Sequence, residues 1–171
     1  MSWRNWSLKA KLGGGFGVVF LFLVAIVLVA YLKMGGMVAF LADARYVNEL
    51  DRELAQREVD HLKFLQKMDA FFIDDAITTV DVTIDDHVCG LGKWLYGPGA
   101  EVAIARYPEI ASLVKRMESP HAILHQSAKK IKALNQAAKE KKEILAEARG
   151  IYHDLTEPAL REVAANLEEI R

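Results

Sequence analysis

Near the middle of the chain the sequence reads Cys89-Gly90-Leu91-Gly92-Lys93-Trp94-Leu95-Tyr96-Gly97, and this stretch holds the only cysteine of the protein. A single cysteine cannot form a disulfide within its own chain. It is therefore an inert buried side chain, a reactive thiol or a metal ligand. Gly90 and Gly92 flank Leu91, and glycine permits backbone conformations that other residues avoid. The stretch predicts a glycine-rich turn that carries a thiol.

Histidines on both sides of the cysteine complete a possible metal site. His61 precedes Cys89, and His121 and His125 follow it, four positions apart. In a helix this spacing places two imidazoles on one face about one turn apart, where they can hold one ion. One thiolate with three imidazoles suits Zn²⁺ better than Mg²⁺ or Ca²⁺, which prefer oxygen ligands. Four protein ligands leave no open position for a reactive water, so the set argues against a hydrolytic enzyme.

Several of these residues also have simpler interpretations. His61 falls in line with leucines on a helical stripe and could be a core histidine bonded to a carbonyl. His87, two residues before the cysteine, is expected in a loop beside the site rather than as a ligand. Trp94 is expected either to shield the site from water or to pack in the core. His153, near the end of the chain, is predicted to be unrelated.

These motifs together resemble a known family. The upstream histidine, the run Cys-Gly-Leu-Gly-Lys-Trp and the His-x-x-x-His pair are similar to the chemoreceptor zinc-binding domain, from about Asp43 to Arg171. The resemblance implies a zinc site held by four residues, namely His61, Cys89, His121 and His125. Similar domains occur in bacterial chemotaxis receptors and diguanylate cyclases, where they sense zinc availability or hypochlorous acid. It further implies that Cys89 is the redox-sensitive ligand and that chemotaxis signalling proteins act downstream.

An apolar segment near the N-terminus predicts a membrane anchor. The residues from Leu12 to Leu32 carry no charge, and about 20 such residues span a bilayer as a helix. The run is longer than a typical signal core, and no small-x-small cleavage site directly follows it, so we predict an uncleaved span. Basic residues precede it, namely Arg4, Lys9 and Lys11. This bias predicts a cytoplasmic N-terminus in the inner membrane and a periplasmic sensory domain.

The predicted domains follow from this segment. We expect a cytoplasmic terminus at 1–11, a transmembrane helix at 12–33, a linker at 34–42 with a break at Gly35-Gly36, and a helical zinc-binding domain at 43–171. The residues just before the span also resemble a methyl-accepting receptor. The placement differs from most members of the family, whose zinc-binding domain is cytoplasmic and follows the signalling region.

Residues that recur at alternating spacings of three and four, most of them apolar, predict a long helix after the span. They are Val47, Leu50, Leu54, Arg57, His61, Leu65, Met68 and Phe72. The β-branched residues at 78–84 have strand propensity, but a lone strand would have no partner, so we expect a connector or an imperfect helix. A helix start is predicted at Ser119-Pro120, with Ser119 as the cap.

Later signals complete the predicted fold. Gly150 predicts an interruption, and Thr156 before Pro158 predicts a second helix start with Thr156 as its cap. Together the patterns predict an all-α fold, with the transmembrane helix followed by an antiparallel four-helix-type bundle. The helical pattern is unfinished at Arg171, which predicts that the chain is truncated.

Net charge restricts the classes of partner that we expect. A net charge of −1 gives no indication of a nucleic-acid partner, so the membrane and a second copy in a homodimer are the expected partners. We predict a zinc-binding sensory domain of a membrane receptor rather than an enzyme. The alternatives are a four-helix small-molecule receptor without metal, which would purify metal-free, and a bundle metalloenzyme, which would show a metal-bound water.

Overall fold

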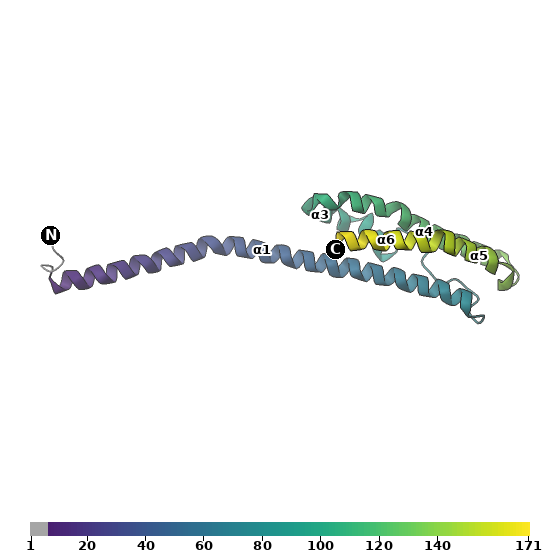
Figure 1. The fold of residues 1–171 in the computed structure, drawn as a ribbon, viewed down its shortest axis with the longest axis horizontal. Coiled ribbons are helices and arrows are strands. Elements are labelled where there is room, and N and C mark those ends of the chain that lie inside the picture. The colour runs from purple at the N-terminus through teal and green to yellow at the C-terminus, as the bar shows by residue number, and fades with distance from the viewer. Residues whose placement is uncertain (1–6) are drawn as a thin grey trace. The chain divides into compact units, whose positions relative to one another are not determined.

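The structure is a computed structural model that describes residues 7–171 (Figure 1). The elements in this range are all helical, which confirms the prediction of an all-α fold. The chain divides into two compact units, Met1–Glu49 and Leu50–Arg171. The predicted boundaries of the linker and of the zinc-binding domain remain predictions.

The first unit consists of the N-terminal part of helix α1 (Leu8–Ile73). Its apolar side chains are exposed along the segment predicted to span a membrane, and the helix is long and apolar enough to do so. α1 continues through Gly35-Gly36, where we predicted a break. Glycine disfavours a helix by only about 1 kcal/mol relative to alanine, so a pair does not force an end. Arg4, part of the predicted basic flank, lies outside the described residues.

The second unit contains the remainder of α1 and eight shorter helical elements. These are α2 (Gly90–Leu95), α3 (Pro98–Arg106), the 3₁₀ helix η2 (Pro108–Ile110), α4 (Ala111–Ala137), the 3₁₀ helix η3 (Lys141–Glu143), α5 (Leu145–Ile151), the π-helix η4 (Tyr152–Thr156) and α6 (Glu157–Ile170). Three long arms result, namely α1, α4 and the series from α5 to α6. The described residues contain no fourth long helix, and Pro98 and Pro108 each begin a new short element between α1 and α4.

The direction of the arms differs from the predicted up-and-down arrangement. Within the second unit, α4 runs the same way as α1, and α6 runs opposite to both (Figure 1). The reason is the connector, residues 74–89, which carries the chain back along α1 without regular structure. Extended chain covers more than twice the length per residue that a helix does, so a short segment suffices. The expectation of a connector rather than a strand is confirmed.

The core forms two clusters of buried side chains, and the predicted ligands of α1 and α4 lie between them. Towards the end of α1, one cluster joins Phe64, Met68 and Phe71 to side chains of α4 and the last arm. The other surrounds Leu54 and Trp94. The predicted stripe on α1 is buried at Leu54, His61, Met68 and Phe72, although Val47 is exposed.

One predicted helix start is wrong, and a second is confirmed in position but not in its side-chain cap. Pro120 lies inside α4, although it lacks the N–H that an interior helical residue donates. Its neighbours Met117, His121 and Leu124 are buried on the same side, and this packing outweighs the local preference for a start. α6 begins at Glu157 with Thr156 in the N-cap position, as predicted. The Thr156 side chain does not cap the helix, because its hydroxyl lies 2.7 Å from the buried hydroxyl of Ser127.

The predicted glycine turn is also wrong. Gly90 begins a short helix, and none of the described glycines has a positive φ. The helix forms because the Cys89 side chain caps it, its sulfur accepting the N–H of Gly92 at 3.2 Å. The same residue therefore fixes the start of α2 and presents a thiol to the interior.

Candidate metal centre

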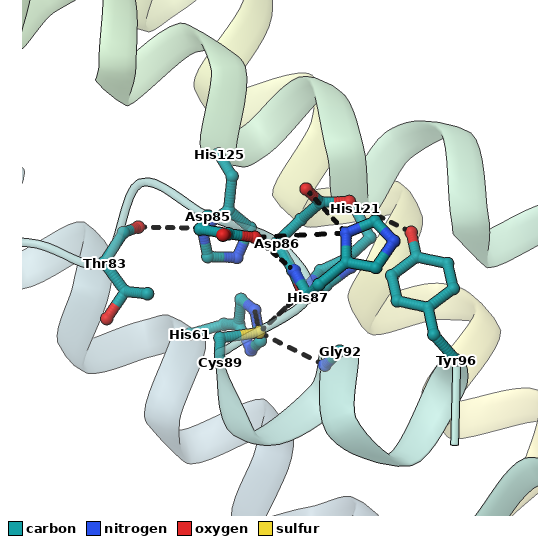
Figure 2. Close-up of polar contacts among 10 residues, drawn as sticks. All are labelled: His61, Thr83, Asp85, Asp86, His87, Cys89, Gly92, Tyr96, His121 and His125. Atoms are coloured by element: carbon teal, nitrogen blue, oxygen red, sulfur yellow. Dashed lines mark hydrogen bonds and ion pairs between the residues drawn. The ribbon is translucent and has the colours of Figure 1, made fainter.

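Three separate segments supply the four predicted ligands. His61 lies on α1, Cys89 precedes α2, and His121 and His125 lie one turn apart on α4 (Figure 2). Their possible ligand atoms all lie within 4.8 Å of one another. The three imidazoles are buried and the thiol is half-buried. The fold therefore brings together residues that are far apart in the sequence.

The spacing of these atoms fits a tetrahedral ion. The Cys89 sulfur lies 3.2 Å from Nε2 of His121 and 4.0 Å from Nε2 of His61. Zinc binds sulfur at about 2.3 Å and imidazole nitrogen at about 2.0 Å, so tetrahedral angles separate the two atoms by about 3.5 Å. The two observed distances lie on either side of this value.

Backbone carbonyls orient two of the imidazoles. Nδ1 of His61 lies 2.7 Å from the carbonyl of Arg57, and Nδ1 of His125 lies 2.8 Å from the carbonyl of Thr83. Each Nδ1–H donates to its carbonyl, which leaves Nε2 of the neutral ring as the free acceptor. Such hydrogen bonds commonly fix the tautomer of histidines that bind metals.

Two buried nitrogens in the site have no hydrogen-bond partner, namely Nε2 of His125 and Nδ1 of His121. A buried polar atom without a partner costs about 1–3 kcal/mol. A bound ion would satisfy Nε2 of His125, which is the nitrogen that the Thr83 carbonyl leaves free. The donor set, the spacing and this unpaired nitrogen therefore all fit zinc.

Burial keeps the three imidazoles neutral. It lowers the pKa of His61 and His125, and it lowers the pKa of His121 to about 3, with neighbouring imidazoles contributing further. Burial raises the pKa of the Cys89 thiol, and the N–H of Gly92 offsets part of that rise. At neutral pH the imidazoles are thus ready to bind a cation, and the thiol must release its proton to do so.

The neutral histidines predict a pH dependence of the metal-free fold. The pKa of each of these histidines is lower in the folded chain than in the unfolded chain, so below pH 6.5 the unfolded chain binds more protons and the free energy of unfolding falls as pH falls. We expect His121, whose pKa is lowered to about 3, to account for a loss of about 2 kcal/mol between pH 6.5 and 5. Urea unfolding in EDTA measures it. His121→Asn should weaken the dependence of the free energy of unfolding on pH, and His153→Ala should leave it unchanged. A flat profile above pH 5 would contradict the assignment.

The remaining predicted residues lie outside the group of four. His87 is exposed, stacks on Tyr96 with ring centres 4.1 Å apart, and lies 3.3 Å from a carboxylate oxygen of Asp86 (Figure 2). Trp94 is buried in the core cluster beside Leu91. His153 is paired instead with the side chain of Glu157.

The role of some residues that shape the site could not be identified from the sequence. A side chain on Gly92 would place its Cβ 1.6 Å from the backbone oxygen of Asp86. That same oxygen lies 3.5 Å from the Cys89 sulfur, and the Asp86 side chain accepts the hydroxyl of Tyr96 at 3.1 Å. Glycine at 92 is thus needed for close contact of α2 with the end of the connector. The glycine itself was the only signal in the sequence.

Comparison with known families places this site in a described domain. Residues 61–132 match the model of the chemoreceptor zinc-binding domain, and the candidate zinc site of His61, Cys89, His121 and His125 lies within the match. The match covers less than half of the chain. No curated protein and no solved structure matches the chain.

Proposed function

We propose that the chain is a zinc-binding sensory domain of a membrane-anchored chemoreceptor, and that it senses zinc or an oxidant such as hypochlorous acid. The observation that carries this proposal is the convergence of one thiol and three imidazoles, with all ligand atoms within 4.8 Å. The match to a domain described as chemoreceptor zinc-binding supports a sensory role. A closed set of four protein ligands also supports sensing rather than hydrolysis.

Bound zinc would hold the Cys89 sulfur as a thiolate and tie α1, α2 and α4 together at one point. The chain couples this sulfur to its own backbone. Cys89 caps α2 through the N–H of Gly92, and its sulfur also contacts the carbonyl of Asp86. A change at the sulfur therefore acts on the start of α2 and on the end of the connector.

Oxidation of the thiolate is the proposed trigger. Hypochlorous acid transfers its oxygen to the Cys89 sulfur, which gives a sulfenic acid and releases chloride, so that sulfur loses two electrons and chlorine gains them. The product carries no negative charge on sulfur and is a weaker ligand. His61 on α1 and the two histidines on α4 would remain, while α2 is free to shift against them.

The switch predicts a coupled response to oxidant. One equivalent of hypochlorous acid should convert Cys89 to a sulfenic acid, and a second equivalent to a sulfinic acid, with zinc released in the same time course. A zinc-sensitive dye follows the metal, and mass spectrometry of peptides follows the thiol. Cys89→Ser should remove the oxidant-dependent part of the release. Oxidation of methionines with Cys89 unmodified would contradict the switch and favour sensing of zinc availability alone.

We further propose that the apolar part of α1 spans the inner membrane with the zinc-binding domain outside the cytoplasm. The uncharged run from Leu12 to Leu32 and the basic residues Lys9 and Lys11 before it support this orientation. An alkaline phosphatase reporter fused after Arg171 should then be active in intact cells. Activity of a cytoplasmic reporter at the same position would reverse the orientation.

A further inference from the structure

A cavity of about 390 Å³ lies beside the candidate metal centre, between α1 and the connector. Its inner wall includes the side chains of His61, Cys89 and His125. Phe64 and Val88 add apolar surface to it. A volume of a few hundred cubic ångströms suits a small molecule, and here that molecule would meet the thiol directly.

The cavity also carries basic side chains. Lys63 and Lys67 line it from α1, together with one carboxylate, Asp60. Asp60 lies 3.6 Å from Arg57, which also pairs with Glu53 at 3.1 Å, and Lys67 pairs with Asp81 at 3.3 Å. Lys63 is exposed and has no ion pair among the described residues. Lys63 is thus the basic side chain of the cavity wall that no carboxylate pairs with among the described residues.

We propose that this cavity is the route by which small anions reach the metal centre, and that Lys63 selects for them over neutral molecules. The inference rests on the proposed function, because it names the class of molecule that reaches the same thiol. Zinc with one thiolate and three neutral imidazoles carries one net positive charge, which would add to the attraction of the lysine. The apolar wall at Phe64 and Val88 and the cavity volume favour anions with a few heavy atoms.

Alkylation of Cys89 by two reagents of similar size tests the selection. Iodoacetate is an anion and iodoacetamide is neutral. In both reactions the thiolate sulfur attacks the methylene carbon and iodide leaves. The full chain in detergent, with and without EDTA, is treated with each reagent and the modified cysteine is quantified by mass spectrometry. The measured quantity is the rate with iodoacetate divided by the rate with iodoacetamide. The fraction of thiolate cancels in this ratio, because both reagents attack the same form of the same residue.

We expect the ratio to exceed that of the urea-unfolded chain. One unit charge at about 8 Å in water changes the local concentration of a monovalent anion about two- to threefold. Lys63→Gln should therefore lower the ratio about two- to threefold, and Lys63→Glu about fivefold. The effect should shrink as salt is added, because salt screens exposed charges.

Two control variants test whether a change in the alkylation ratio comes from the cavity. Lys130→Gln removes the same charge from an exposed lysine of α4 that does not line the cavity, and the ratio should stay unchanged. Val88→Trp should fill the opening and slow both reagents equally. An equal fall in Lys63→Gln and Lys130→Gln, or a ratio equal to that of the unfolded chain, would overturn the proposal. Zinc content measured on the samples without EDTA tests the proposed function separately, because the effect of Lys63 on the ratio is read in EDTA, where no zinc charge contributes.

Discussion

Replacing His125 by alanine is expected to lower zinc affinity by more than 100-fold. Removal of residues that merely orient a metal ligand already costs 10- to 100-fold, and His125 is placed to be a ligand itself. Its Nε2 is buried without a partner, while Nδ1 is held by the carbonyl of Thr83. The loss also removes the two-point attachment that His121 and His125 provide from one helix. Competition titration with a chromogenic chelator measures the affinity.

The matched control is His153→Ala, which removes an exposed imidazole paired with Glu157. This variant should bind about one zinc per chain, like the parent. Stabilisation by zinc gives a second measurement. At a free zinc concentration 100 times the Kd, the free energy of unfolding of the parent rises by about 2.7 kcal/mol. His125→Ala should gain little at the same concentration. Equal affinity in the two variants, or a parent without zinc, would falsify the ligand assignment.

Gly92→Ala is expected to disrupt the site although residue 92 binds nothing. The added Cβ would lie 1.6 Å from the backbone oxygen of Asp86, and real contacts of this kind are about 3.4 Å or longer, so α2 and the connector must separate. The sulfur of Cys89 lies between these two segments and moves with them. We expect a loss of about 3 kcal/mol in the free energy of unfolding, at the upper end for overpacking, and a sharp fall in zinc occupancy.

Gly150→Ala is the matched control for this substitution. Gly150 lies within α5, and no atom would lie within 4 Å of its Cβ. Alanine is the better helix former, so this variant should gain about 0.5–1 kcal/mol and keep its zinc. Urea unfolding with and without EDTA measures both variants. Similar stability of Gly92→Ala and the parent would show that the contact with Asp86 is not required.

The sequence was most informative where chemistry restricts the choice of residues. A single cysteine and a pair of histidines four residues apart leave few ways to build a soft metal site, and the structure gathers Cys89, His61, His121 and His125 as expected. The apolar stripe on α1 was readable for the same kind of reason, because burial on one face imposes a helical period. Hence the fold class and the candidate ligands could both be predicted.

Features of the fold and of the site that depend on packing between distant segments could not be predicted. Pro120 looked like a helix start because its local preference was visible, whereas the packing that keeps it inside α4 was not. The direction of α4 depends on the path of the connector, which has no periodic pattern. The carbonyls of Arg57 and Thr83 orient two histidines, but every residue has a carbonyl, so no sequence signal marks them. Gly92 was noted for its backbone freedom, and its role is instead steric.

The π-helical turn at Tyr152–Thr156 keeps the last arm in angular register with the rest of the bundle. Ala148, Tyr152, Thr156 and Leu160 are all buried, and they lie four positions apart. Three steps of four residues in an α-helix rotate a side chain by about 120° from its starting direction, which would carry Leu160 off the buried side. The extra residue accommodated by a π turn offsets about 100° of this rotation. One wide turn thus lets α5 and α6 present a single continuous face to α4, with the Thr156 hydroxyl aimed at Ser127.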